Sequence, residues 1–246
     1  MSAERFVQLQ RDHFYERADA SHFRWQTEAP WFSATEAELV RGVGHPGERV
    51  LEIGCGEGGN LHHLRARSPG LRLFGVDFSP AKVAFARNAT GAHTAAADAT
   101  RLPFADCSFD AVLIRDLLHH LPNRLHAMKE ARRVLKPGGR LTLVEPNRRS
   151  LLVLLQAALV PAERGVLGST AEQLRAELAA AGFDVLESDE RQPFPIARVL
   201  LNPRFGTTVF GGIPPVGRIL DSIDRVARRL VPRSAWLYLT FQATRT

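Results

Sequence analysis

A glycine-rich turn is the feature of this chain best suited to bind a ligand. Residues 50–53 form a short run typical of a buried parallel strand, and Gly54, Gly56 and Gly59 follow it where a helix is expected to begin. Because glycine has no side chain, a ligand can approach the backbone N–H groups of such a turn closely. The spacing also satisfies the dinucleotide-binding pattern, which is a weak signal when it stands alone. We therefore expect a nucleotide-like cofactor at this turn.

Carboxylates follow the next two expected strands. Asp77 comes after the strand expected over residues 71–76, where it could accept hydrogen bonds from both ribose hydroxyls of a nucleoside. Asp98 comes after the strand expected over residues 92–96, where it could accept one from an exocyclic amine such as that of adenine. Two structural alternatives remain open, since Asp77 could merely stabilise a helix N-terminus and Asp98 could be a turn residue.

The elements that must position these residues alternate between strand and helix from residue 49 to residue 145. We expect further strands over residues 49–53, 109–114 and 140–144, and helices over residues 59–67, 80–88 and 124–135. Ser79 before Pro80 is a typical helix start, and Pro137 followed by two glycines should end the third helix. Such alternation predicts parallel strands joined by right-handed crossovers.

The pattern changes beyond residue 146. We expect helices over residues 151–160, 171–181 and 216–230, and strands over residues 183–188 and 235–244. Five prolines between residues 193 and 215 exclude a long regular element there. The predicted fold is an α/β doubly wound, mostly parallel seven-stranded sheet of the Rossmann-like type, with an antiparallel last strand. We expect residues 1–48 to form a helical cap and residues 49–246 the main domain, with residues 146–168 and 191–233 as substrate-side additions.

With these motifs assembled, the chain resembles the class I S-adenosylmethionine-dependent methyltransferases, of the small-molecule type called methyltransferase-11-like. The resemblance covers residues 49–145, and its motifs are residues 50–58, 76–80, 97–99, 108–112, 118–122 and 135–141. It implies S-adenosyl-L-methionine as cofactor and methyl transfer as activity. The Asn-Pro-Pro-aromatic signature of methyltransferases that act on nucleic-acid or protein amides is absent after the fourth strand, where residues 115–118 are Arg-Asp-Leu-Leu.

The resemblance also implies roles for individual residues. The backbone at Gly54 and Gly56 would approach the methionine moiety, and Asp77 would bind the ribose hydroxyls. Phe78 would pack on the adenine, and Asp98 would accept a hydrogen bond from its amine. The expected cofactor-binding residues are Glu52, Gly54, Cys55, Gly56, Asn60, Asp77, Phe78, Asp98, Ala99 and Arg115.

Methyl transfer from a sulfonium requires mainly in-line positioning of the acceptor, and a general base only where the acceptor is a poor nucleophile. We expect His119 or His120 to be this base, because an imidazole titrates near neutral pH. Asp116 is a further candidate, and His13, His22 and Glu145 are alternatives. The purely structural interpretation of the histidine pair remains open.

The acceptor is expected to be a small, largely apolar molecule, such as a natural-product or lipid-like intermediate. Aromatic residues before position 33 and between positions 193 and 215 could fold over the carboxyl edge of the sheet as a dry lid. The residues predicted to bind the acceptor are Tyr15, Trp25, Trp31, Glu145, Phe205 and Phe210.

Composition excludes several other classes of protein. The formal net charge of +6 comes from basic residues spread along the chain, which argues against a nucleic-acid partner. Two cysteines are too few for a zinc site or a disulfide scaffold, so we expect no metal and a reducing, cytoplasmic location. No run approaches the ~20 apolar residues of a transmembrane helix, and the N-terminus has no signal-peptide core.

Two other functions remain open, and the sequence says nothing about the oligomeric state. An NAD(P)-dependent oxidoreductase would use the same glycine turn, although it would not account for Asp98. A non-catalytic, cofactor-binding scaffold could use the arginines of residues 216–230 to dock on a partner or to contact an anionic membrane peripherally.

Overall fold

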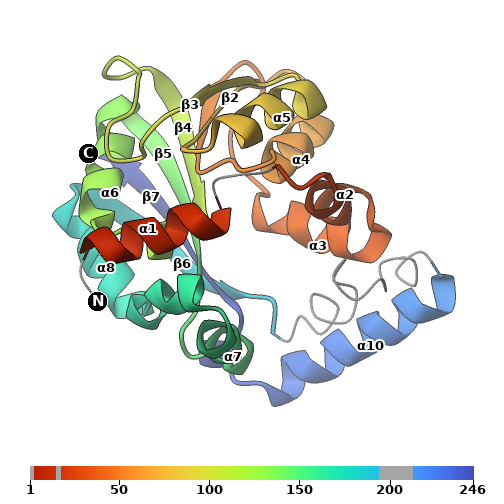
Figure 1. The fold of residues 1–246 in the computed structure, drawn as a ribbon. Coiled ribbons are helices and arrows are strands. Elements are labelled where there is room, and N and C mark those ends of the chain that lie inside the picture. Colours follow the sequence, from red (N-terminus) through yellow and green to blue (C-terminus); the bar gives the residue numbers. More distant parts are fainter. Residues whose placement is uncertain (1–2, 15–17, 194–212) are drawn as a thin grey trace.

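The computed structural model describes residues 3–14, 18–193 and 213–246 and contains a seven-stranded sheet with helices on both faces (Figure 1). The strand order is β3-β2-β1-β4-β5-β7-β6. The first five strands in this order are parallel to one another, and β7 is antiparallel to both β5 and β6. The seven strands are β1 (Arg49–Ile53), β2 (Arg72–Asp77), β3 (His93–Ala96), β4 (Phe109–Arg115), β5 (Leu135–Pro146), β6 (Phe183–Arg191) and β7 (Tyr238–Arg245). The predicted fold class is confirmed.

The order of the strands reverses between β1 and β4. From β1 the chain adds β2 and β3 on one side, and from β4 it adds β5 on the other. Ligands of doubly wound sheets bind outside the carboxyl ends of the strands at such a reversal. The carboxyl ends of β1, β2 and β4 are therefore the place where a ligand site is expected.

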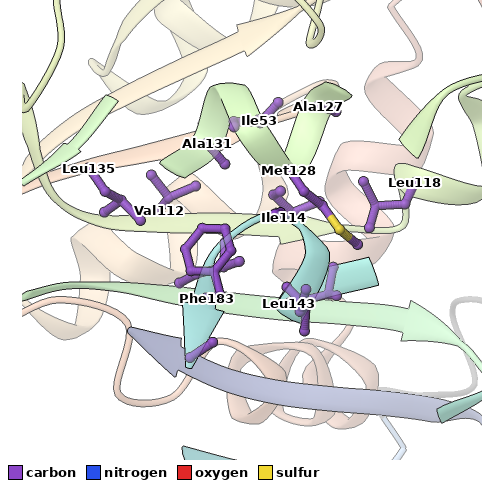
Figure 2. Close-up of a cluster of buried hydrophobic side chains, with 14 of the residues drawn as sticks. Ile53, Val112, Ile114, Leu118, Ala127, Met128, Ala131, Leu135, Leu143 and Phe183 are labelled. Carbon is purple, nitrogen blue, oxygen red and sulfur yellow. The ribbon is translucent and has the colours of Figure 1, made fainter. Parts of the chain in front are cut away.

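The core lies on both sides of the central strands, which are apolar because helices cover both faces. Helix α6 (Arg124–Val134) turns Ala127, Met128 and Ala131 toward Val112 and Ile114 of β4, and Figure 2 shows this cluster. All five side chains have no exposed surface. Truncating such a buried Ile to Ala typically costs about 2–5 kcal/mol, so this packing fixes β4 and the residues that follow it.

Two further helices follow strands whose ends face the expected site. Helix α4 (Gly59–Arg67) follows β1, and α5 (Pro80–Thr90) follows β2. The predicted cap of α5 is confirmed, because the hydroxyl of Ser79 accepts a hydrogen bond from the backbone N–H of Lys82 at 3.4 Å.

Some boundaries differ from the sequence expectation. Strand β5 begins at Leu135 rather than at residue 140, because Leu135 pairs with Phe109 and Arg140 pairs with Ala111. The Lys-Pro-Gly-Gly segment between them bulges out of the ladder, so it does not end the strand. Strand β6 continues to Arg191, because its antiparallel pairing with β7 extends as far as Tyr238.

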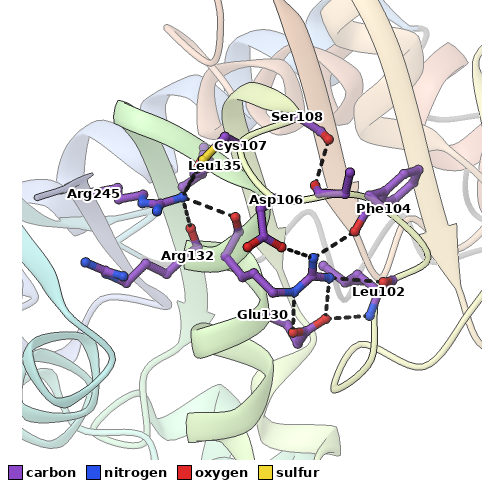
Figure 3. A network of polar contacts seen from close by, with 11 residues as sticks. Leu102, Phe104, Asp106, Cys107, Ser108, Glu130, Arg132, Leu135 and Arg245 are labelled. Carbon is purple, nitrogen blue, oxygen red and sulfur yellow. Dashed lines mark hydrogen bonds and ion pairs between the residues drawn. The ribbon is translucent and has the colours of Figure 1, made fainter.

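A network of arginines fixes the long loop between β3 and β4 (Figure 3). The guanidinium of Arg133 on α6 donates to Glu130 and Asp106 and to the carbonyls of Leu102 and Phe104, at 2.7–3.1 Å. Arg245 at the end of β7 donates to the carbonyls of Arg132 and Arg133 at 3.0 and 3.1 Å. The loop begins with residues 97–99, so the network stabilises the stretch that is expected to contact adenine.

Apart from α8 (Ala171–Ala180), which packs against α6 and β6, the remaining helices lie around the carboxyl edge of the sheet. Figure 1 shows α1 crossing in front of the sheet and α7 and α10 along the lower margin of the molecule. None of the helices in the described ranges is both long and apolar enough to cross a bilayer. These elements are α1 (Ala3–Phe14), α2 (Ala20–Glu28), α3 (Pro30–Leu39), α7 (Leu151–Leu159), α8 (Ala171–Ala180), α10 (Pro214–Leu230) and the short 3-10 helices η1 (Leu118–His120), η2 (Pro161–Gly168) and η5 (Arg233–Ala235).

Candidate active site

A cavity of about 780 Å³ lies at the carboxyl ends of β1, β2 and β4. This volume is within the range of about 300–1,000 Å³ that is typical of ligand sites. The ten residues predicted to bind the cofactor all line it, because parallel strands bring their carboxyl ends to one edge of the sheet. Most of the rest of the wall comes from α1, α2, η1, α7, η2 and the start of β7, and Pro80 and Lys82 of α5 also line it.

The glycine turn follows β1 as predicted. Gly54 and Gly56 adopt φ angles of +80° and +50°, which disfavour any residue with a Cβ. The N–H groups of Gly54 and Cys55 both donate to the carbonyl of Val76, at 2.8 and 2.9 Å. The turn is therefore anchored on β2, and its exposed backbone faces the cavity.

The third glycine of the turn serves helix packing. A Cβ at Gly59 would overlap the side chain of Gln26, which α2 places over the start of α4. In the dinucleotide pattern the same position allows close packing of helix and strand. The close approach of an N-terminal helix here was not predicted from the sequence.

Asp77 joins the turn to the end of β2. Its carboxylate accepts hydrogen bonds from the backbone N–H groups of Gly56 and Ser79, both at 3.0 Å. The side chain is almost fully buried, and this burial raises the pKa of Asp77 despite the two hydrogen bonds. Carboxylate oxygens can accept more than one hydrogen bond each, so Asp77 can still accept from a ligand in the cavity.

A chain of polar contacts connects Glu52 to Arg115 beneath the cavity. Asn60 donates to Glu52 Oε1 at 2.6 Å and accepts from Arg115 Nη1 at 2.8 Å. Arg115 also forms a fully buried ion pair with Glu36 of α3. The backbone of Arg115 at the end of β4 is thereby held against the glycine turn.

Glu52 has one carboxylate oxygen without a partner. Its Oε2 is buried and accepts no hydrogen bond from the protein, and the residue lines the cavity. Burial is the main cause that raises the pKa of Glu52 to about 8, although Asn60 and the charge of Arg115 act against it. A buried acceptor of this kind suits a ligand that brings a cation, such as the ammonium group of S-adenosylmethionine.

The far end of the cavity has the features expected for a nucleobase. Phe78 is 37% exposed and lines the cavity next to Asp77. Asp98 accepts hydrogen bonds from the N–H and the hydroxyl of Thr100, both at 2.7 Å and both on Oδ1. These contacts orient its carboxylate, while its other oxygen makes no such bond to Thr100. Ala99 beside it is small and buried, which leaves room for a flat ligand.

His119 lies between two carboxylates. Its Nδ1 is 2.8 Å from Glu145 Oε2, and its Nε2 is 3.3 Å from Glu163 Oε2 on η2. Burial alone would lower the pKa of His119, but the charges and hydrogen bonds of Glu145 and Glu163 outweigh it and raise the pKa to about 10. His119 is therefore an imidazolium at neutral pH and has no lone pair with which to accept a proton.

Glu145 organises this centre from the end of β5. Its Oε1 accepts hydrogen bonds from the backbone N–H groups of Leu117 and Leu118, at 2.9 and 2.8 Å. The buried carboxylate thus caps η1 and fixes the ring of His119 at the same time. Burial would raise the pKa of Glu145, but the charge of His119 lowers it. Its oxygens are committed to these contacts, and Glu145 does not line the cavity, which differs from its predicted contact with the acceptor.

His120 differs from His119 in charge. The two rings lie 3.8 Å apart between centroids, and burial together with the charge of His119 lowers the pKa of His120 to about 3. His120 is therefore neutral at pH 7, and it lines the cavity. Ligand atoms of His119, His120 and Glu163 lie within 4.8 Å of one another, a spacing that could also hold a metal ion. The charge of His119 already compensates Glu163 without one.

Asp116, the residue after Arg115 at the end of β4, also lines the cavity. It has a φ of +50°, and its Oδ2 is 3.0 Å from the hydroxyl of Tyr238 and 3.3 Å from Nε of Arg115. Both Asp116 and Tyr238 line the cavity. One oxygen of the Asp116 carboxylate is therefore fixed by its neighbours, and the residue lines the same cavity as His120.

Several residues of the wall were not predicted from the sequence. Gln10 of α1 donates to the carbonyl of Ala162 on η2 at 2.7 Å, which joins α1 to η2 over the cavity. Glu163 pairs with His119 only because α7 and η2 return the chain to the sheet edge, and no local pattern indicates that path. The apolar part of this wall consists of Val7, Leu121, Val153, Val166 and Leu237.

The predicted aromatic contacts are placed elsewhere. Trp25 stacks on Phe32 with ring centroids 3.9 Å apart, inside a small core of α2 and α3. Trp31 donates from Nε1 to Asp221 of α10 at 2.6 Å. Neither lines the cavity, because the apolar side of these helices packs on the protein itself. Tyr15, Phe205 and Phe210 lie outside the described residues.

Comparison with known sequences shows what the central part of the chain is similar to. Residues 51–143 match the family model described as a methyltransferase domain. The chain is 35% identical over 155 residues to 27-O-demethylrifamycin SV methyltransferase of Amycolatopsis mediterranei (strain S699), covering 59% of this chain and 51% of that protein. It is 36% identical over 120 residues to a demethylmenaquinone methyltransferase of Deinococcus radiodurans, covering 47% and 48%. The chain thus spans about half the length of these curated relatives.

A solved structure extends the likeness in fold to nearly the whole chain. An S-adenosylmethionine-dependent methyltransferase from Thermotoga maritima, described as a possible histamine N-methyltransferase, matches with a TM-score of 0.67 at 19% identity and covers 98% of this chain and 100% of that chain. The strand order and the cavity at the carboxyl ends of β1, β2 and β4 are those of a Rossmann-like nucleotide-binding fold. The chain is therefore similar to the class I S-adenosylmethionine-dependent methyltransferases, in sequence over residues 51–143 and in fold over nearly its whole length, and S-adenosyl-L-methionine is the cofactor of that class.

Proposed function

We propose that this protein transfers a methyl group from S-adenosylmethionine to a small, largely apolar acceptor. The observation that carries the proposal is that one cavity is lined on one side by the strand-end residues and on the other by apolar side chains of α1, α7 and η2. The names of the two relatives refer to demethylrifamycin and demethylmenaquinone, which supports a small molecule rather than a macromolecule as the acceptor.

The proposed cofactor site divides into three parts. Asp77 binds the ribose hydroxyls, and Phe78 packs against the adenine while Asp98 accepts a hydrogen bond from its amine. The free oxygen of Glu52 pairs with the ammonium group, which the glycine turn and the backbone at Arg115 help to hold. When bound there, S-adenosylmethionine supplies an electrophilic methyl group on a sulfonium.

The residues beyond the cofactor side position the acceptor and exclude water. The apolar side chains of α1, α7 and η2 exclude bulk water from the acceptor, which favours reaction within a fixed geometry. The Gln10 contact and the pair between His119 and Glu163 keep α1 and η2 against the sheet edge. His119 is thus proposed as a positioning residue rather than as a base.

His120, which is neutral at pH 7, and Asp116 are the two groups proposed to assist proton transfer from the acceptor. A pKa of about 3 makes His120 a weak base, so we propose that it accepts a hydrogen bond from the acceptor and orients it. Asp116, held by Tyr238, is the neighbouring carboxylate to which an acceptor proton can pass. Positioning therefore supplies most of the rate, with His120 and Asp116 assisting acceptors that must lose a proton.

Calorimetric titration separates this proposal from its competitors. We expect S-adenosylmethionine and S-adenosylhomocysteine to bind and NAD to fail to bind. Asp77→Asn should weaken both ligands, whereas Arg72→Gln, at the opposite edge of the sheet, should not. Turnover is then measured as S-adenosylhomocysteine release with apolar phenol, hydroquinone and amine acceptors and with phosphoethanolamine as a charged contrast. NAD binding, or turnover of the charged acceptor alone, would overturn the proposal.

A further inference from the structure

The outer face of α7 is apolar and exposed. Four leucines at helical spacing occupy it, and the most exposed of them, Leu151 and Leu159, have 76% and 73% of their surface in contact with solvent. The inner face of the same helix is also apolar, since Val153 and Ala157 are buried against the body of the protein. Helices on a protein surface normally present polar residues outward, so this helix lacks the usual solvated face. The exposed leucines are Leu151, Leu154, Leu155 and Leu159.

Helix α10 has a second exposed apolar row with a row of arginines beside it. Ile219, Val226 and Leu230 are spaced seven and four residues apart, so they lie in one line along the helix, and more than half of each side chain is exposed. An arginine precedes each of them, and these three arginines form a parallel line about 100° around the helix. They are Arg218, Arg225 and Arg229.

The two carboxylates of α10 already have partners. Arg228 pairs with Asp224 at 2.8 Å, and the exposed Asp221 accepts a hydrogen bond from Trp31 at 2.6 Å. Within residues 3–14, 18–193 and 213–246, no carboxylate forms an ion pair with Arg218, Arg225 or Arg229. An apolar row bordered by uncompensated arginines is the pattern of helices that lie in the interface of an anionic membrane.

Both helices are joined to the edge of the sheet where the cavity opens. Helix α7 begins shortly after Pro146, and α10 ends shortly before Tyr238, the residue that pairs with Pro146 across β5 and β7. Figure 1 shows both helices along the same margin of the molecule. Eleven large hydrophobic side chains are exposed among the described residues, and nine of them belong to α7, η2, α10 or the residue before α10.

We propose that α7 and α10 together form a surface that docks on an anionic lipid bilayer. The exposed leucines of α7 and the apolar row of α10 insert among the acyl chains near the headgroups, and the three arginines contact the anionic headgroups. The acceptor then enters from the bilayer side past α7, whose Val153 and Gln156 line the cavity; this last step rests on the proposed function, whereas the docking does not.

Charge distinguishes a bilayer from a second copy of the chain as the occupant. A two-fold contact would use the same surface of both copies, so their arginine rows would meet in one interface. Like charges gathered in one interface repel, and α7 carries no acidic residue that could compensate them. An anionic bilayer provides headgroups for the arginine row and acyl chains for the apolar rows.

Vesicle sedimentation with the full chain tests the proposal. The probes are vesicles of phosphatidylcholine alone and of phosphatidylcholine with phosphatidylglycerol, at about 0.1 M and 1 M salt, where the Debye length falls from about 10 Å to 3 Å. We expect binding to the anionic vesicles at the lower salt concentration and much weaker binding in the other three conditions.

Two variants and two matched controls assign the binding to this surface. Arg218, Arg225 and Arg229 are changed together to Gln, and we expect partitioning to fall about fivefold per arginine, or about a hundredfold for all three. The control changes Arg41, Arg67 and Arg72, three exposed arginines at the opposite edge of the sheet, to Gln. A second variant changes Leu151, Leu155 and Leu159 to Gln, and its control is Leu186→Gln on β6, a leucine that is 63% exposed.

The outcomes that overturn the proposal are specific. Absence of binding to anionic vesicles, or retained binding by both triple variants, excludes this surface as a membrane contact. Concentration-dependent dimerisation in solution that the leucine variant abolishes assigns the surface to self-association instead. Calorimetry of S-adenosylmethionine with the same variants checks that the cofactor site is intact, so loss of membrane binding and failure of the proposed function remain distinguishable.

Discussion

The charge state of His119 can be tested by replacing it with glutamine. Its pKa rises from 6.5 to about 10 in the fold, and each unit of difference corresponds to about 1.4 kcal/mol of stability. The shift in pKa alone corresponds to a stabilisation of the fold by roughly 5 kcal/mol. Removing one partner of a buried ion pair typically costs about 3–5 kcal/mol. We therefore expect His119→Gln to lose about 3–5 kcal/mol at pH 7, which is roughly 10 °C in Tm for a chain of this size.

The sign of the pH dependence follows from the direction of the shift. Because the pKa of His119 is raised in the fold, its contribution is complete below pH 6.5 and is lost as the pH rises toward 10. The gap in Tm between the wild type and His119→Gln should therefore narrow from pH 6.5 to pH 10. Glu52 also titrates in part of this range, since burial raises its pKa to about 8, but both proteins contain it and its effect cancels in the difference.

Thermal melts followed by circular dichroism from pH 6 to pH 10.5 measure this gap. His126→Gln is the matched control, because His126 is an exposed histidine on α6. In the double variant with Glu163→Gln, part of the lost stability should return, since one of the two uncompensated carboxylates is removed. A gap that stays constant across the range, or a loss below about 1 kcal/mol, would mean that His119 is neutral in the fold and would refute the reasoning.

Four further predictions concern single residues. Glu52→Gln should weaken S-adenosylmethionine binding about 10- to 100-fold above pH 8, and calorimetry should show wild-type affinity rising up to that pH while the variant stays flat. Asp77→Asn should weaken S-adenosylmethionine and S-adenosylhomocysteine by equal factors; unequal factors would count against a ribose contact. His120→Gln should reduce the loss of stability between pH 6.5 and pH 3 in acid titrations, because the lowered pKa of His120 opposes protonation in the fold. Gly165→Ala would place a Cβ against the carbonyl of His119, and hydrogen exchange should show η2 less protected; unchanged protection would contradict the close packing.

The sheet could be predicted from the sequence because each strand is bounded by local signals. Apolar runs, the Ser79 cap and the turn residues fixed most strand and helix limits to within a few positions. The start of β5 could not be predicted, because Pro137 and the two glycines after it normally end an element. Here the pairing of Leu135 with Phe109 continues the ladder past them, and this pairing depends on tertiary structure.

The cofactor side of the cavity could be predicted for a similar reason. Strand ends such as Asp77 and Asp98 necessarily meet at one edge of a parallel sheet, so sequence position alone indicates their neighbourhood. The acceptor side depends on how α1, α7 and η2 return over that edge. Nothing local indicates that Glu163 reaches His119, or that Trp25 stacks inside the N-terminal helices instead of facing the cavity.

The ion pair between Glu36 and Arg115 has a consequence for how the chain folds. Arg115 ends β4 in the centre of the sheet, while the anion that compensates it comes from α3, which precedes the first strand. A cut between residues 48 and 49 would remove the fully buried counter-charge of Arg115 and leave only the partly exposed Asp116 beside the guanidinium, at a cost of about 3–5 kcal/mol. That is a large part of the stability of a typical domain. The N-terminal helices and the sheet are therefore expected to unfold in one cooperative transition, and a shortened chain that starts at β1 is expected to be a poor folding unit.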